Sequence, residues 1–196
     1  MSAVPIRLLT PEEYLAQERL APFKSEFYRG EVFAMAGESF KHTRVKDNFA
    51  RAAGNQLDPG PCAVLTSDMR VRIPATGLFT YPDIVIVCDK PEFDDKVMDT
   101  LLNPLAMVEV LSDSTEKKFD RGTKFAQYRK ILSLQEFILA AQDQPLLERY
   151  ARQPDGDWLL TEFRGLEITF EMTCLRVKIP MNEIYRGVEF PETPPR

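Results

Sequence analysis

The chain of 196 residues has few residues of the kinds that build disulfide frameworks or zinc sites. It holds three cysteines, Cys62, Cys88 and Cys174, which are far apart and odd in number. Two of them lie in apolar runs, so their spacing indicates neither a disulfide framework nor a CxxC metal site. We therefore expect a protein of a reducing compartment.

Several other features are missing. No apolar run approaches the ~18 residues needed to span a bilayer, and the first residues lack the charged-then-apolar pattern of a signal peptide. Glycine-rich phosphate loops, HExxH, GxSxG and zinc-finger spacings are also absent. The sequence thus predicts a cytoplasmic protein that does not enter a membrane. With a net charge of -5, the protein lacks the overall basic excess that nucleic-acid-binding proteins often show.

The length and the 44% hydrophobic content suit one domain with a substantial core. We expect a single domain over residues 1–190. The end of the chain, "PETPPR" at 191–196, is typical of a disordered tail.

Local patterns predict helices and a hairpin in the first third. Thr10 followed by Pro11 and two acids is typical of a helix start, and this helix should run to about Arg19. "SEFYRGEVFAMAG" alternates around Arg29-Gly30, which predicts a β-hairpin. Apolar residues recur at helical spacing from 43 to 57.

An α/β core is predicted next. Strands are expected at 62–73, 83–89 and 105–111, a helix at 121–132 whose buried face would contain Phe125, Tyr128 and Leu132, and a strand at 136–141. The core order is therefore helix, three strands, helix, strand. The segments "LLERYAR", "DWLLTEFRG" and "LRVKIP" predict a C-terminal antiparallel β meander.

The strand at 105–111 carries one carboxylate in an apolar run. Glu109 shares a face with Met107 and Leu111, so it should be largely desolvated and needs a cation, a metal or a proton. Asp83 stands at the start of the neighbouring strand, where the two carboxylates can converge. Mg²⁺ is held by one or two carboxylates plus substrate phosphates, so we predict Asp83 and Glu109 as ligands of Mg²⁺ or Mn²⁺.

A lysine on the following helix can complete this site. Lys124 lies at the margin of the helix face that packs on the sheet, so its stem can be buried while its ammonium reaches Glu109. In phosphodiester hydrolysis a metal positions the attacking water, and a lysine can stabilise the transition state or orient that water.

The motifs "YPDIVIVCD", "MVEVLSDSTEKKFDRGTKFAQYRK" and "GVEFP", with "SEFYRGEVFAMAG" and "SFKHTRV" upstream, resemble the Uma-two family over about residues 10–191. That family is assigned to the PD-(D/E)XK nuclease superfamily of restriction-endonuclease-like proteins. The resemblance implies metal-dependent phosphodiester cleavage in nucleic acid, with DNA favoured because superfamily members cut DNA, and metal ligation by Asp83 and Glu109.

One position departs from the superfamily pattern, in which the lysine follows the acid by two residues. That position is Leu111 here, and the resemblance implies that Lys124 supplies the amine from the helix. Glu26 matches the family's early acid, and it would complete the metal site or hold Lys124.

Non-catalytic interpretations remain open. Glu109 and Lys124 could form a structural ion pair, and Asp83 could only begin a strand. His42, placed just before the helix at 43–57, could act as a base, contact phosphate, cap the helix or be exposed. Asp68 is a weaker candidate.

Charged segments near the predicted site leave two further alternatives. A basic cluster could bind phosphate; it comprises Lys117, Lys118, Arg121, Lys124, Arg129 and Lys130 with Arg70 and Arg72. The acidic segment 89–99 could cover the cleft as a lid.

Two functions follow from these observations. The first is a Mg²⁺-dependent endonuclease; the alternative is a non-catalytic interaction or assembly module that keeps the fold and a Glu-Lys pair. Strand edges at "FILAA" and in the meander suggest a homo-oligomer.

Overall fold

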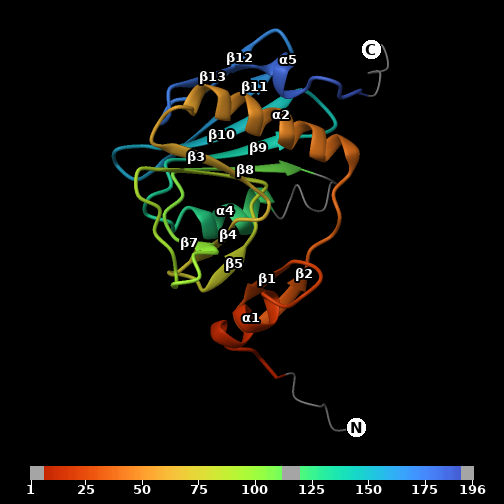
Figure 1. Ribbon diagram of the computed structural model, residues 1–196. Helices are drawn as coiled ribbons and strands as arrows, with labels where there is room; N and C mark the ends of the chain where they lie inside the picture. Colours follow the sequence, from red (N-terminus) through yellow and green to blue (C-terminus); the bar gives the residue numbers. More distant parts are fainter. Residues whose placement is uncertain (1–6, 112–119, 191–196) are drawn as a thin grey trace.

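The computed structural model describes residues 7–111 and 120–190, and a six-stranded sheet lies at its centre (Figure 1). The strand order in this sheet is β11-β10-β9-β8-β6-β3. Its strands are β3 (Cys62–Thr66), β6 (Ile84–Cys88), β8 (Ala106–Leu111), β9 (Glu136–Ala141), β10 (Leu146–Arg152) and β11 (Trp158–Arg164).

The two central strands, β8 and β9, are buried along their whole length and pair in parallel. All other neighbours in this sheet are antiparallel. Burial on both faces explains the continuous apolar runs in the sequence, because such a strand has no solvated side to carry polar residues.

One face of the sheet is covered by α2 (Phe40–Leu57), by the hairpin β12 (Thr169–Met172) and β13 (Val177–Pro180), and by α5 (Met181–Ile184) (Figure 1). Val45, Phe49 and Ala53 recur at helical spacing along α2 and are fully buried against the sheet.

The other face packs on a second, five-stranded sheet with the order β2-β1-β5-β4-β7, and on α4 (Phe125–Tyr128). These strands are β1 (Ser25–Tyr28), β2 (Glu31–Ala34), β4 (Arg70–Ile73), β5 (Leu78–Thr80) and β7 (Thr100–Leu101). Alternation along β8 divides its side chains: Val108 and Val110 face α2, whereas Met107 and Leu111 face the second sheet.

The N-terminal elements have the structure that the sequence predicts. Helix α1 (Pro11–Glu18) begins with a capping box between Thr10 and Glu13. Strands β1 and β2 form an antiparallel hairpin, and Arg29 and Gly30 occupy its turn with positive φ angles. This hairpin brings Glu26, on β1, toward the central sheet.

The predicted core order of helix, three strands, helix, strand is confirmed by α2, β3, β6, β8, α4 and β9, with β4, β5 and β7 inserted between them. Two predicted elements were wrong. The strand expected at 62–73 is two strands in different sheets, because a turn at Ser67-Asp68 separates β3 from β4. The helix expected at 121–132 is a π-helical turn, η1 (Asp120–Lys124), followed by the single turn of α4, and Leu132 is 90% exposed.

The predicted C-terminal meander is divided between two sheets. Strands β10 and β11 extend the central sheet, whereas β12 and β13 form a separate antiparallel pair. "FILAA" does not offer an edge as we expected, because β9 is paired on both sides, with β8 and β10. The edges of the central sheet are β3 and β11.

The prediction that the cysteines form no disulfide was also wrong. Cys62 and Cys88 are directly opposed on β3 and β6 and are joined by a disulfide, while Cys174 is a free thiol. Their separation of 26 residues hid a pairing that the antiparallel register creates. Within residues 7–111 and 120–190, no helix is long and apolar enough to cross a membrane. The tail expected at 191–196 lies outside the described residues.

Candidate functional site

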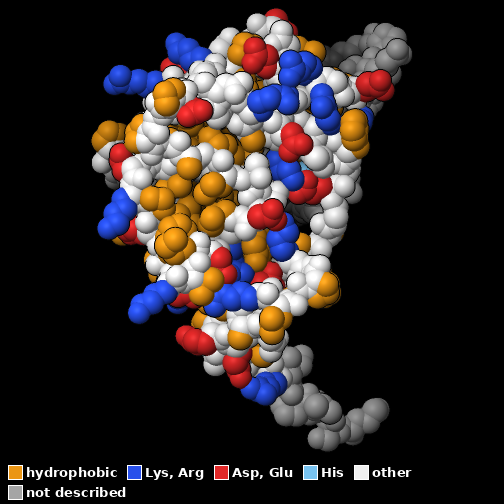
Figure 2. Space-filling model, viewed as in Figure 1, with side chains coloured by type: hydrophobic (Ala, Val, Ile, Leu, Met, Phe, Trp, Pro, Cys, Tyr) orange, Lys and Arg blue, Asp and Glu red, His pale blue; other side chains and the backbone are white. Residues whose placement is uncertain are grey.

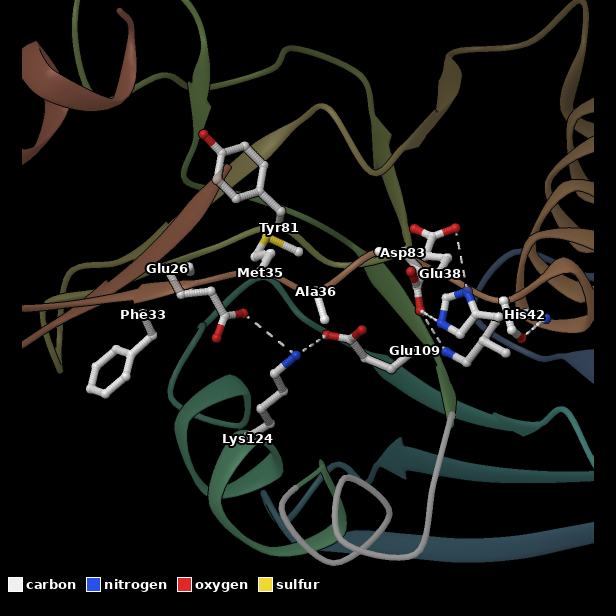
Figure 3. Close-up of a pocket in the computed structure, with 14 residues that line it drawn as sticks. Glu26, Phe33, Met35, Ala36, Glu38, His42, Tyr81, Asp83, Glu109 and Lys124 are labelled. Carbon is white, nitrogen blue, oxygen red and sulfur yellow. Dashed lines mark hydrogen bonds and ion pairs between the residues drawn. The ribbon is translucent and has the colours of Figure 1, made fainter. Parts of the chain in front are cut away.

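A pocket of about 300 Å³ opens where β1, β6, β8 and the start of α2 meet (Figure 3). Its lining includes all four residues that the sequence predicts for the site, Glu26, Asp83, Glu109 and Lys124. Residues 33–39, which run from the end of β2 to the cap of α2, form another wall. Four segments distant in sequence therefore meet in one small space.

Asp83 immediately precedes β6 and is fixed by the backbone of the neighbouring strand. The N–H of Val110 donates to Asp83 Oδ2 over 2.7 Å, so the carboxylate is held against the backbone of β8 at the residue that follows Glu109. Among the described residues, no group donates a hydrogen bond to Asp83 Oδ1. Asp83 thus begins the strand, as one alternative suggested, and also presents an oxygen to the pocket.

Glu109 is buried on β8, as the alternation of the sequence predicts, and only 5% of its surface is exposed. Its Oε1 accepts a hydrogen bond of 2.7 Å from the Tyr128 hydroxyl and one of 3.3 Å from Lys124 Nζ. Burial, followed by the negative charge of Glu109, raises the pKa of Tyr128 well above its ordinary value. The Tyr128 hydroxyl therefore stays protonated and can donate.

Lys124 links the two acids on its side of the pocket. Its Nζ lies 3.5 Å from Glu26 Oε1, in addition to its contact with Glu109 (Figure 3). Glu26 is fixed in turn by Thr80, whose hydroxyl donates to Glu26 Oε1 over 2.5 Å. The Lys124 ammonium therefore reaches a carboxylate on β8, as the sequence predicts.

His42 is the residue that sequence reasoning placed wrongly. It lies within α2, not before it, and only 6% of its surface is exposed. Its Nε2 is 3.2 Å from Asp83 Oδ2 and its Nδ1 is 3.4 Å from Glu38 Oε2. Figure 3 shows these three side chains together on the side of the pocket opposite Glu26.

The acids around His42 raise the pKa of its imidazole. Burial lowers the pKa of His42, but the hydrogen bond and charge of Asp83, with the charge of Glu38, outweigh burial and raise it above its ordinary value. Lys46 forms an ion pair with Glu38 and donates to Ser67 Oγ over 2.9 Å. A serine that can cap a helix was the signal in the sequence for the true position of His42. Ser39 accepts from the N–H of His42, so His42 is in the first turn of α2.

The acidic segment 89–99 does not line the pocket, so it does not cover the site as a lid would. Instead it pairs with arginines of the second sheet and of the end of α1: Asp94 with Arg72, and Asp99 with both Arg70 and Arg19, the C-cap of α1. Arg70 is buried and also donates to the Tyr81 hydroxyl. These arginines therefore serve the fold, contrary to the alternative of a phosphate-binding surface.

Other members of the predicted cluster lie elsewhere. Asp68 is exposed in the turn before β4 and pairs with Lys24, away from the pocket lining. Arg129 and Lys130 are exposed. Lys117 and Lys118 lie outside the described residues, as does the side chain of Arg121. On the face of the molecule that Figure 2 shows, acidic and basic side chains are interspersed on one half and apolar side chains gather on the other.

The donor set of the pocket suits a divalent cation. Glu38, His42 and Asp83 each offer one ligand atom, and these atoms lie within 4.8 Å of one another. Asp83, just before β6, and Glu109, on the adjacent strand β8, offer carboxylate oxygens, the atoms that Mg²⁺ prefers as ligands. Both groups of residues therefore bring carboxylates to a position where a metal and a phosphate could meet.

Comparison with known proteins connects this site to a family. A family described as "Putative restriction endonuclease", Uma2, matches residues 11–182. Two proteins of Synechocystis sp. (strain ATCC 27184 / PCC 6803 / Kazusa), named "Uncharacterized protein slr1290" and "Uncharacterized protein sll1609", are similar to this chain. The first is 33% identical over 96% of this chain and 97% of its own length, and the second is 34% identical over 90% and 99%.

A solved structure has the same fold. It is described as a "putative nuclease belonging to DUF820 from Anabaena variabilis ATCC 29413" and superposes with a TM-score of 0.71. The superposition covers 94% of this chain and all of the other, at 16% identity. Together with the family match, which spans most of the chain, it confirms the α/β restriction-endonuclease-like fold. The chain belongs to the Uma2 family of restriction-endonuclease-like proteins.

Proposed function

We propose that the protein is a metal-dependent nuclease that hydrolyses phosphodiester bonds in nucleic acid, with DNA as the substrate. Family membership and fold support a restriction-endonuclease-like nuclease. The observation that carries the proposal further is the position of Lys124 Nζ, 3.3 Å from Glu109 Oε1 in the pocket that also contains Asp83.

Each residue has a distinct task in this proposal. Asp83 and Glu109 hold Mg²⁺ or Mn²⁺, and a metal bound there would activate the attacking water and neutralise phosphate charge. Lys124 donates hydrogen bonds to the phosphoryl oxygens as charge develops on them. Glu26 holds the Lys124 ammonium at the pocket from the side opposite Glu109.

The surrounding contacts explain how these groups stay in position. The Val110 N–H fixes Asp83 and the Tyr128 hydroxyl fixes Glu109, so both carboxylates are oriented before a ligand arrives. Groups held in place in this way need little reorganisation during the reaction, which is the main source of electrostatic catalysis. Water attacks phosphorus, the bond to the leaving oxygen breaks, and a phosphate monoester and a hydroxyl result.

Cleavage assays test this proposal. Single-stranded, duplex and branched DNA are incubated with the protein in Mg²⁺ or Mn²⁺, and with three variants, Asp83→Asn, Glu109→Gln and Lys124→Met. Lys130→Met is the matched control, because Lys130 is an exposed lysine six residues away that does not line the pocket. We expect cleavage by the wild type and the control, and a loss of about 100-fold or more in the three variants.

The same assays decide against the alternative function, a non-catalytic interaction module in which Glu109 and Lys124 are a structural pair. Absence of cleavage by metal-loaded wild-type protein on every substrate would refute the nuclease and favour the module. Equal cleavage by Lys124→Met and wild type would refute the assignment of the lysine.

A further inference from the structure

The buried imidazole of His42 is only partly accounted for by the contacts around it. Its Nδ1 is buried and has no hydrogen-bond partner in the described part of the chain, although Glu38 Oε2 is 3.4 Å away. An unsatisfied buried polar atom is costly, so its retention indicates a ligand or a role. The task that we assigned to Asp83, Glu109 and Lys124 does not use it.

Local structure explains why two of these side chains face the same point. Ser39 caps α2 through the His42 N–H, which starts the helix between Glu38 and His42. Glu38 precedes this cap, and its carboxylate folds back to the side of the first turn that carries His42, with Oε2 3.4 Å from His42 Nδ1. That side faces Asp83 at the beginning of β6, and His42 Nε2 reaches Asp83 Oδ2 at 3.2 Å.

We propose that Glu38, His42 and Asp83 form a divalent cation site that favours a first-row transition ion such as Mn²⁺ over Mg²⁺. The inference rests on the proposed function for the use of the pocket, and it adds Glu38 and His42, on the α2 side, to Asp83 as ligands of the cation. The ligand atoms lie within 4.8 Å of one another, and two ligands at about 2.0–2.2 Å from one ion are at most about 4.4 Å apart, so a shift of a few tenths of an ångström brings them onto one ion. Mg²⁺ takes oxygen ligands, whereas Mn²⁺, which carboxylates also suit, accepts an imidazole nitrogen beside them as other first-row transition ions do.

Contacts of the carboxylates favour Asp83 as the central ligand. Glu109 Oε1 already accepts from Tyr128 and Lys124, and Glu38 pairs with Lys46, so each of these two carboxylates shares its charge with an ammonium. Asp83 Oδ1, in contrast, accepts no hydrogen bond from the described residues. Asp83 is therefore available to a cation held by His42.

The structural alternative is an ion pair between Glu38 and Lys46. That contact exists and neutralises one carboxylate, and Thr43 Oγ1 also donates to Glu38 over 3.3 Å. It accounts for Glu38 alone, however. It leaves the Nδ1 atom of His42 without a hydrogen bond in the described part of the chain.

Manganese binding tests the proposal directly. The protein is stripped of metal with a chelator and titrated with Mn²⁺, and the loss of the free-ion EPR signal gives the Kd. The variants are His42→Gln, Glu38→Gln and Glu109→Gln, and the control is Asp47→Asn, which removes an exposed carboxylate from the same helix. Glu38 is 29% exposed, so Glu38→Gln should fold even if His42→Gln is destabilised.

We expect His42→Gln and Glu38→Gln each to weaken Mn²⁺ binding by about tenfold or more, with Asp47→Asn unchanged within about twofold. Pulsed EPR of bound Mn²⁺ should show nitrogen hyperfine coupling that His42→Gln abolishes. Excess Mg²⁺ should displace Mn²⁺ only at far higher concentration.

Two outcomes would overturn the inference. One is wild-type affinity in both His42→Gln and Glu38→Gln while Glu109→Gln loses Mn²⁺, which places the cation on the strand acids and leaves the proposed nuclease intact. The other is bound Mn²⁺ without nitrogen coupling. If Mn²⁺ binding depends on His42 but no substrate is cleaved, the site is upheld and the proposed function fails.

Discussion

Replacement of Lys124 by methionine is the perturbation whose effect the structure defines best. Methionine keeps most of the buried stem and removes the ammonium, which lies 3.3 Å from Glu109 Oε1 and 3.5 Å from Glu26 Oε1. The carboxylates of Glu26 and Glu109 then lose the ammonium that lies between them. In the absence of metal we expect a lower free energy of unfolding.

The magnitude follows from the distances and the burial. At an effective dielectric constant of about 20, each attraction is worth about 5 kcal/mol before desolvation is subtracted. Removing one partner from a buried pair costs about 3–5 kcal/mol in practice. Exposed fractions of 15% for Lys124 and 17% for Glu26 give some hydration to the remaining charge, whereas Glu109 has 6%. We therefore expect a loss of about 3 kcal/mol.

Urea unfolding with a chelator present measures this loss, and Lys130→Met again serves as the control. Adding a divalent cation should recover part of the stability, because a ligand that binds only the folded state stabilises it. A loss below about 0.5 kcal/mol, the range of an ordinary surface substitution, would refute our description of a buried cation that holds two acids together.

Two further predictions concern stability. Tyr128→Phe removes the hydroxyl that donates to Glu109 and should cost about 1.5–3 kcal/mol in urea unfolding, since the acceptor is a buried carboxylate; a neutral effect would contradict it. The hydrogen bond from Arg19, with Arg70 nearby, holds the pKa of Asp99 well below its ordinary value. This contribution to stability is therefore present above the unfolded pKa of about 3.9 and is lost as pH falls toward the folded pKa. Asp99→Asn should be less stable than wild type near neutral pH, and the difference should shrink in acid; a pH-independent difference would contradict the assignment.

The pattern of β8 shows what the sequence can predict. Burial of an acid between Met107 and Leu111 follows from strand alternation alone, and the need for a cation follows from burial. The lysine was predictable because it lies in the segment that must return the chain to a parallel strand, β9. Contacts between elements that are neighbours in the sequence could therefore be predicted.

Contacts between distant segments were not. The position of His42 against Asp83 depends on how α2 crosses the sheet, and the Cys62–Cys88 disulfide depends on the register of β3 and β6. Neither register nor helix crossing can be read from local periodicity, because many arrangements bury the same apolar face. The pairing of the acidic segment with Arg70 and Arg72 was hidden for the same reason.

Charge in the pocket has a consequence for the order of binding. Of the described residues that line it, four are carboxylates, Glu26, Glu38, Asp83 and Glu109, and Lys124 is the one lysine. Such a lining repels a phosphodiester unless a divalent cation is bound first. We therefore expect DNA to bind the stripped protein weakly and to bind more tightly when a cation is present. Fluorescence anisotropy with Ca²⁺, an oxygen-binding ion, measures this, and equal affinity with and without the ion would show that the phosphate contacts lie elsewhere.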